Sequence, residues 1–206
     1  MSSKDGVLEF LEELRSIAQL GLNYSQDEYD RERYSRLLEM ASRGYGEISG
    51  LTEEIVLRRF QSELGHVTPK VGVNGAVFSE SGELLLSRRR DDSRWEVPGG
   101  WVDVRETPRQ AVCRELEEEL GLTVEVEGII DVFGRMPGDY GQPHTTCHLL
   151  FHCRLRDSGP VCCGEEVIEA GYYNPSAIEN WHRDHDRMAE SAKRYWIKVI
   201  TDGGRQ

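Results

Sequence analysis

Residues 107–122, TPRQAVCRELEEELGL, constrain the fold of this 206-residue chain more than any other stretch. Thr107 and Gln110 match the capping box, in which the two side chains satisfy exposed backbone N–H groups at a helix start. Pro108 suits the first helical position, because its missing N–H would have no helical partner there. These signals predict a helix over 108–120.

This helix has two faces of different chemistry. At 100° per residue, one arc carries apolar side chains that predict packing against a core, and a neighbouring arc gathers carboxylates. The apolar positions are Cys113, Leu116 and Leu120, and the carboxylates are Glu115, Glu118 and Glu119. Carboxylates three or four residues apart repel one another, so the arrangement needs either full solvation or a cation.

The residues around the helix favour a cation. Gly100 is followed after five residues by Glu106, and after seven more by Arg114-Glu115-Leu116-Glu117-Glu118-Glu119-Leu120-Gly121-Leu122. This spacing resembles the Nudix box of the Nudix hydrolases at every position of the signature. The resemblance implies an α/β (α+β) Nudix fold, with a mixed β-sheet sandwiched between helices. It also implies hydrolysis of a nucleoside diphosphate linked to another moiety.

The resemblance further implies roles for individual residues. The metal ligands would be Glu115, Glu118, Glu119 and the backbone of Gly100, with Mg²⁺ or Mn²⁺ as cofactor. Arg114 would hold the geometry of the cluster. Glu106 would be either a further ligand or a residue that shapes the loop.

Candidate residues outside the box are less sharply specified. Glu166 matches an acidic position that some members use as a metal-linked or basic glutamate, and the alternative is an exposed loop acid. Arg88 and Arg90 lie two apart in a strand, so both can meet substrate phosphates, or both can lie in water. Tyr140 and His144, in a Gly- and Pro-containing loop, are candidates to contact a base or leaving group. The run 182–186 is interpreted as a charged helix start rather than a metal site.

The residue pattern changes from helical to strand-like near residues 65–70, which predicts a boundary between two regions. Residues 1–65 predict three short helices, around 7–21, from a capping box at 25–28, and from Thr52 to Leu64. Residues 66–206 predict the hydrolase domain. Its expected elements are a β-hairpin of 71–78 and 83–90, strands at 95–98, 123–133 and 148–155, and helices at 174 and 186–200.

The N-terminal region also resembles that of the CDP-choline pyrophosphatase group, often labelled ADP-ribose pyrophosphatases. That resemblance implies a homodimer, which would cover the thin core of three small helices.

The composition argues against some classes of binding partner. The net charge of −12 argues against general binding to nucleic acid or to a membrane surface. The five cysteines lack a C-x-x-C pair, and no long apolar run predicts a leader or membrane span, so a cytoplasmic protein is expected.

Two alternative functions stay open: hydrolysis of a nucleoside triphosphate or an RNA 5′ end, and nucleotide sensing without catalysis. An isomerase would need a reactive Cys and acid pair, which Cys147 and Cys153 do not visibly supply.

Overall fold

The computed structural model describes residues 3–63, 66–156 and 159–203. The chain forms two compact units, one of residues up to 70 together with 135–146, the other of 71–134 with the residues from 147 onward. Leu64 and Gly65, where the sequence predicts the end of a helix and the start of a linker, lie outside the described residues.

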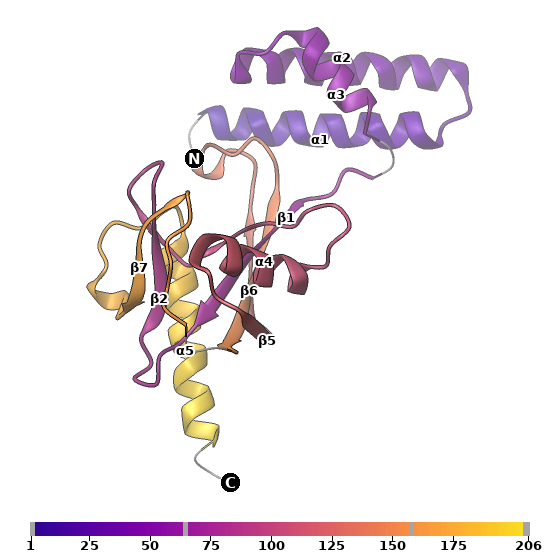
Figure 1. The fold of residues 1–206 in the computed structure, drawn as a ribbon. Helices are drawn as coiled ribbons and strands as arrows, with labels where there is room; N and C mark the ends of the chain where they lie inside the picture. The colour runs from indigo at the N-terminus through magenta and orange to yellow at the C-terminus, as the bar shows by residue number, and fades with distance from the viewer. Residues whose placement is uncertain (1–2, 64–65, 157–158, 204–206) are drawn as a thin grey trace. The chain divides into compact units, whose positions relative to one another are not determined.

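The first unit is built on three helices: α1 (Ser3–Tyr24), α2 (Glu28–Ser49) and α3 (Glu53–Gln61) (Figure 1). Their apolar faces meet in a small core. Its buried members are Leu8, Leu11, Ala18, Leu38, Tyr45, Val56 and Phe60. Thr52 caps α3 as predicted, because its side chain accepts a hydrogen bond from the Ile55 N–H.

The start of α2 differs from the sequence prediction. Its N-cap is Asp27, whose Oδ1 accepts from the Asp30 N–H at 2.9 Å. Ser25 is unavailable as a cap because α1 continues to Tyr24, and the Ser25 N–H donates to the Gly21 carbonyl at 2.9 Å. The predicted capping box of 25–28 is therefore wrong by two residues.

The second unit contains two sheets. One has the strand order β4-β1-β6-β5 and the other β3-β2-β7. The strands are β1 (Lys70–Val77), β2 (Leu84–Arg89), β3 (Trp95–Glu96), β4 (Gly99–Trp101), β5 (Val124–Arg135), β6 (Thr146–Leu155) and β7 (Val167–Tyr173). Two short 3₁₀ turns, Asp139–Gly141 and Pro175–Ala177, lie in the connections.

The predicted hairpin of 71–78 and 83–90 is wrong. A turn does connect the two strands, but only an isolated bridge between Phe78 and Leu84 joins them. β1 instead pairs with β4, and β2 pairs with β3 and β7, because each strand is buried and occupies the interior of its own sheet. The mixed sheet expected from the sequence is therefore divided in two.

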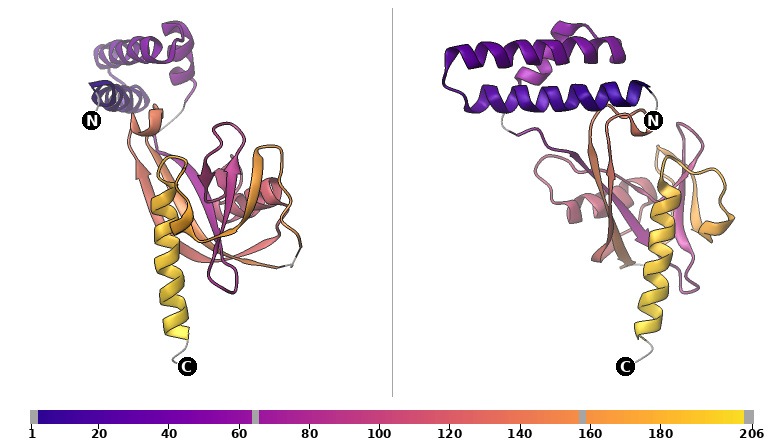
Figure 2. Two further views of the ribbon diagram at one scale, coloured as in Figure 1. Left: turned by 90° about the vertical axis from the view of Figure 1, so that its left-hand side faces the viewer. Right: turned by 180° about the vertical axis from the view of Figure 1, so that it is seen from behind.

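Helices α4 (Pro108–Leu120) and α5 (His185–Gly203) lie on opposite sides of the strands (Figure 2). The apolar face of α4 packs with Val73, Val77, Leu85 and Phe151. α5 contributes Met188, Ala189 and Ala192 to a second cluster with Ala76, Leu84, Leu86, Val97 and Leu150. This arrangement confirms the predicted fold class, strands sandwiched between helices. In the described part of the chain, no helix is long and apolar enough to span a membrane.

The packing of α4 predicts a large cost for truncating its core face. Leu116 is completely buried, so Leu116→Ala should lower the free energy of unfolding by about 2–5 kcal/mol. Urea denaturation measures the change. Glu117→Ala, one position along on the exposed face, is the control and should change stability by less than about 0.5 kcal/mol. Equal effects of the two substitutions would contradict the packing described for α4.

Candidate active site

The ends of α4 are set by the residues that the sequence predicts. The Thr107 side chain accepts from the Gln110 N–H, and the Gln110 side chain accepts from the Thr107 N–H at 2.9 Å. Gly121 ends the helix in the left-handed conformation, at φ 66°. Cys113, predicted to pack, is only partly buried, with its thiol 3.7 Å from the Val124 carbonyl oxygen. The carboxylates of α4 therefore project from a helix that is fixed at both ends.

Arg114 connects the acidic residues. Its guanidinium donates to both oxygens of Glu106, at 3.1 and 2.7 Å. Its Nη1 donates to Glu115 Oε1 at 2.9 Å and to Glu118 Oε2 at 3.0 Å. Its Nη2 also reaches the Trp101 carbonyl at 3.1 Å. The guanidinium of Arg114 thus holds three carboxylates and the last residue of β4, because its planar fork can donate in several directions at once.

Glu106 acts in the loop before the helix. Besides its two bonds to Arg114, it accepts from the Asp103 N–H at 2.7 Å. The Arg114 guanidinium holds the pKa of Glu106 below its ordinary value. With both oxygens engaged by protein donors, this carboxylate favours the loop-shaping role over that of a ligand.

Two glycines let β4 approach the carboxylates closely. A Cβ on Gly100 would overlap the Glu115 carboxylate, and a Cβ on Gly99 would overlap the Val73 carbonyl. Gly99 has a φ of 149°, which side chains rarely adopt, and its N–H donates to Glu119 Oε2 at 3.2 Å. The backbone of 99–100 therefore lies directly beside the side chains of Glu115 and Glu119.

The inner carboxylates lie in an environment that penalises negative charge. Burial raises the pKa of Glu119 to about 9, and the charges of Glu96 and Glu115 add to the rise. Burial also raises the pKa of Glu115, against the opposing effect of Arg114. Glu118 is more open, with 63% of its side chain exposed. These glutamates place hard oxygen donors on one rigid face of α4, where positive charge is in short supply. Such a set of ligands fits a divalent cation.

Glu96 is a buried acid that the sequence analysis did not identify. It is 3% exposed, burial raises its pKa to about 7, and Arg89 Nη1 donates to its Oε2 at 3.1 Å. Arg89 also binds Asp91 with two hydrogen bonds, at 2.9 and 2.8 Å. One sign of this buried acid was present in the sequence: Glu96 lies inside the predicted strand 95–98. A carboxylate that is buried in a strand requires a charged partner.

The two predicted phosphate-binding arginines have partners within the protein. Arg88 Nη2 lies 3.0 Å from Glu169 Oε2. Arg90 donates to the carbonyls of Glu165 and Val167, at 2.6 and 3.0 Å. The strand register shifts between Arg88 and Arg89, so simple alternation does not describe this end of β2.

Glu166 lies in a segment that is anchored to the C-terminal end of α4. The Gly164 N–H donates to the Glu119 carbonyl at 2.7 Å, and a Cβ on Gly164 would overlap the Glu118 carbonyl. The Glu166 carbonyl accepts from the Arg90 N–H at 2.8 Å. Glu166 itself lines a cleft of about 510 Å³ together with Arg89, Arg90, Asp91 and Glu165.

Helix α5 starts within residues 182–186, at His185, as the sequence predicts, but several of these charged or titratable side chains are buried. His182, Asp184 and His185 are all at least nine-tenths buried, and ligand atoms of His182, His185 and Glu96 lie within 4.8 Å of one another. The Asp92 carboxylate lies 2.6 Å from His182 Nδ1, and His185 Nδ1 accepts from the Val97 N–H at 3.1 Å. Together with the hydrogen bond from Arg89 to Glu96, these bonds hold the strand that precedes Gly99 and Gly100. We therefore interpret the cluster as a structural support for that strand.

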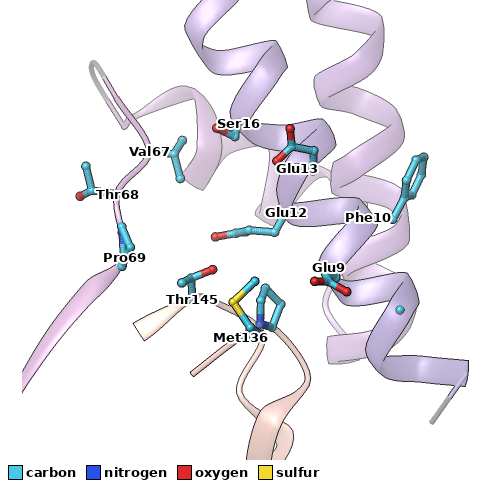
Figure 3. Close-up of a pocket in the computed structure, with 12 residues that line it drawn as sticks. Glu9, Phe10, Glu12, Glu13, Ser16, Val67, Thr68, Pro69, Met136 and Thr145 are labelled. Carbon is cyan, nitrogen blue, oxygen red and sulfur yellow. The ribbon is translucent and has the colours of Figure 1, made fainter. Parts of the chain in front are cut away.

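The predicted contacts Tyr140 and His144 belong to the other compact unit, with the helices. His144 Nδ1 lies 3.5 Å from Glu12 Oε2, and Tyr140 lies near Arg135, 5.9 Å from ring centre to guanidinium carbon. This unit has its own cavity of about 520 Å³. Figure 3 shows Glu12 pointing from α1 into it, with Thr145 below the side chain. Tyr140 and His144 therefore lie in a different unit from the α4 glutamates.

Two protein-family models match this chain. The family model described as the NUDIX domain matches residues 68–195. A second model, described as a UDP-X-like N-terminal oligomerisation domain, matches residues 5–57.

Individual relatives cover much of the chain. The Bacillus subtilis protein named "Putative ADP-ribose pyrophosphatase YjhB" is 33% identical over 166 residues, which are 80% of this chain and 77% of the relative. An ADP-ribose pyrophosphatase from Methanocaldococcus jannaschii is 25% identical over 134 residues, 63% of this chain and 76% of the relative. The crystal structure of a UDP-X diphosphatase covers 100% of this chain and 98% of its own, with 24% identity and a TM-score of 0.57, which supports the shared fold.

The fold and the glutamate-bearing helix define a hydrolase of the mixed α and β class. The chain belongs to the Nudix family, and it is a Nudix pyrophosphohydrolase.

The raised pKa of Glu119 predicts that the metal-free protein loses stability as the pH rises. In the folded protein this carboxyl keeps its proton up to about pH 9, whereas in the unfolded chain it ionises near its ordinary value of 4.5. Between these values the folded state binds more protons, so the free energy of unfolding falls with increasing pH. Urea denaturation in EDTA, near about pH 6 and about pH 8.5, measures the fall.

Glu119→Gln should flatten this pH dependence, because the amide does not titrate. Glu117→Gln, on the exposed side of the same helix, should leave the slope unchanged. The same slope in all three proteins would contradict the environment assigned to Glu119.

Proposed function

We propose that the protein hydrolyses the diphosphate bond of a nucleoside diphosphate linked to another moiety, of the ADP-ribose or CDP-choline type, with Mg²⁺ or Mn²⁺. The observation that carries the proposal is the set of Glu115, Glu118 and Glu119 on one helix, with Arg114 holding the first two. The names of the Bacillus and Methanocaldococcus relatives support the ADP-ribose type.

The cation would be held by these three glutamates together with the Gly100 backbone. When bound, it supplies neutralisation of phosphate charge and an acidified water. Arg114 keeps Glu115 and Glu118 in place and also binds the carbonyl of Trp101, the residue after Gly100 in β4, so both sides of the proposed metal site are tied to one guanidinium. Burial of Glu119 keeps water from competing for its carboxylate.

Glu166 is the candidate for taking the proton of the attacking water. The segment before it is bonded to the backbone of Glu119, and its own carboxylate lines the adjoining cleft. Among the described residues it has no hydrogen-bond donor to its side chain, which leaves the carboxylate available for a proton.

The remaining substrate contacts are also proposals. Arg88 and Arg90 lie at the end of β2 and can contribute positive charge, although both already bind protein groups. Tyr140 and His144 are proposed to contact the base or the leaving group. Arg89, beside Glu96, is added to this set because it lines the cleft that Glu166 also lines.

A second candidate substrate is a nucleoside triphosphate or the 5′ end of an RNA. An RNA pyrophosphohydrolase from Hydrogenovibrio crunogenus is 36% identical over 100 residues, but this match covers only 54% of that protein. The net charge of −12 weakens the RNA option, since binding to nucleic acid relies on basic side chains.

The N-terminal helices are proposed to join two copies of the chain. Residues 5–57 match a domain described by its oligomerisation, and large apolar side chains on α1 are exposed, Phe10 at 63% and Ile17 at 46%. Residues 1–65 would form the dimerisation region and 66–206 the hydrolase domain of a cytoplasmic homodimer. Light scattering should give twice the chain mass of 23.5 kDa, and the mass of a single chain would reject the dimer.

The activity is tested with purified protein, Mg²⁺ or Mn²⁺, and a panel of ADP-ribose, CDP-choline, dinucleoside polyphosphates and nucleoside triphosphates. Chromatography of the products should show cleavage between the phosphates of at least one diphosphate ester. No turnover of any compound by folded protein would favour a nucleotide sensor instead.

Removing the proposed base should reduce catalysis strongly. Glu166→Gln is expected to lower kcat by about 10²–10⁴-fold, because an amide cannot accept the proton of water. Steady-state kinetics on the best substrate of the panel measures the effect. Glu179→Gln, a change of an exposed acid outside the site, is the matched control and should leave kcat unchanged. Unchanged turnover in Glu166→Gln would reject the role.

A further inference from the structure

The chain passes from one sheet to the other at Val97 and Pro98. β3, which ends at Glu96, pairs with β2, and β4, which begins at Gly99, pairs with β1. Val97 and Pro98 lie between these strands, and both are buried. Buried backbone groups need hydrogen-bond partners, and the two strand ladders do not supply them here. We call residues 97–98 the crossing segment.

The crossing segment takes its partners from two other elements. The Val97 N–H donates to Nδ1 of His185, at the start of α5, at 3.1 Å. The Val97 carbonyl accepts from Nδ2 of Asn74, in β1, at 2.8 Å. Pro98 has no N–H, and its carbonyl accepts from the Gly75 N–H at 2.9 Å. Every polar backbone group of the segment is therefore satisfied, two of them by side chains.

The two side chains are specific to this task by their burial. Asn74 is 3% exposed and His185 is 4% exposed, so neither bond is shared with bulk solvent. Each bond fixes a different peptide plane, because a peptide group is rigid and carries its N–H and C=O in one plane. His185 fixes the plane that contains the Val97 N–H, and Asn74 fixes the next plane, which contains the Val97 carbonyl.

These planes lead directly to the glycines beside the α4 glutamates. The Pro98 carbonyl and the Gly99 N–H belong to one peptide plane, and that N–H donates to Glu119 Oε2 at 3.2 Å. Gly100 follows, packed so closely against Glu115 that a Cβ would overlap its carboxylate. A rotation of the crossing segment would therefore turn the Gly99 and Gly100 backbone away from its place beside the helix.

The ring of His185 is held as an acceptor. Because Nδ1 accepts an N–H, the neutral ring carries its proton on Nε2 and has no lone pair left for a metal ion. Ligand atoms of His182 and Glu96 lie within 4.8 Å of one of His185. Both are held in turn, His182 by Asp92 at 2.6 Å and Glu96 by Arg89 at 3.1 Å. The cluster thus supports the acceptor and does not form a second metal centre.

We propose that Asn74 and His185 are positioning residues for the divalent-cation site. By holding the crossing segment, they fix the Gly100 backbone against the α4 glutamates, and they thereby set the affinity for the cation. Both act through the main chain of 97–100 and not by contact with the cation or the substrate. The inference rests on the proposed function, in which the Gly100 backbone is a ligand.

The test removes the acceptor on α5 and then restores it. His185→Leu leaves the Val97 N–H without an acceptor. His185→Asn keeps one, because the asparagine Oδ1 lies as many bonds from the backbone as Nδ1 of histidine. Metal-free protein is titrated with Mn²⁺, and free Mn²⁺ is followed by electron paramagnetic resonance. His185→Leu should weaken binding about tenfold or more, the order of one buried N–H left unpaired, and His185→Asn should stay within about threefold of wild type.

A second variant and a control separate positioning from a general loss of stability. Asn74→Leu removes the donor on the other side of Val97 and should also weaken Mn²⁺ binding about tenfold, whether or not His185→Leu folds. Met188→Ala is the matched control, because Met188 is completely buried in α5, three residues after His185. It should lower the midpoint of urea denaturation and leave Mn²⁺ affinity unchanged.

The outcomes distinguish this proposal from the proposed function. Wild-type affinity in folded His185→Leu or Asn74→Leu overturns the positioning role and leaves the metal site intact. A loss in His185→Asn or in Met188→Ala as large as that in His185→Leu also overturns it, because any disturbance of α5 would then have the same effect. No Mn²⁺ binding by folded wild-type protein rejects the proposed metal site, and the positioning role with it.

Discussion

The guanidinium of Arg114 is the interaction on which the rest of the site depends. It binds Glu106 in the loop before α4, Glu115 and Glu118 on the helix, and the Trp101 carbonyl in β4. Without it, the loop, the helix and the strand would share no common charged partner. A lysine could not replace it, because a single ammonium cannot present donors in a fixed plane to three carboxylates and a carbonyl.

The acidic residues around Arg114 fall into two groups, which differ in burial. Glu106 and Glu118 are satisfied by Arg114 or by solvent. Glu119 and Glu96 lie deeper, where burial raises the pKa of each carboxyl. The fold holds them there through bonds that do not involve a metal: Gly99 N–H to Glu119, and Arg89 to Glu96. The resulting shortage of positive charge is what fits the site to a divalent cation.

Much of this arrangement could be predicted from the sequence because its signals are local. The α4 helix begins and ends where the capping residues and Gly121 indicate, and the glycine pair 99–100 lies beside the glutamates. The pairing of β1 was not predictable in this way. A turn between two apolar strands usually indicates a hairpin, and only the burial of both strands in separate sheets prevents it here.

The residues that sequence reasoning missed depend on long-range contacts. Glu96, Arg89 and His182 come from three separate segments, and their proximity follows from the packing of β2, β3 and the segment before α5. Arg88 and Arg90 were preferred over Arg89 on strand alternation, which fails where the register shifts. Residues 182–186 were interpreted as a charged helix start, and nothing local in the sequence indicates that His182 and His185 are buried.

The central claim is that the α4 glutamates form a divalent-cation site. The most direct test is to titrate metal-free protein with Mn²⁺ and follow free Mn²⁺ by electron paramagnetic resonance. The wild type should bind Mn²⁺ in competition with Mg²⁺, and a folded variant with Glu115, Glu118 and Glu119 all changed to Gln should lose that binding. Undiminished Mn²⁺ binding in the triple variant would contradict the account.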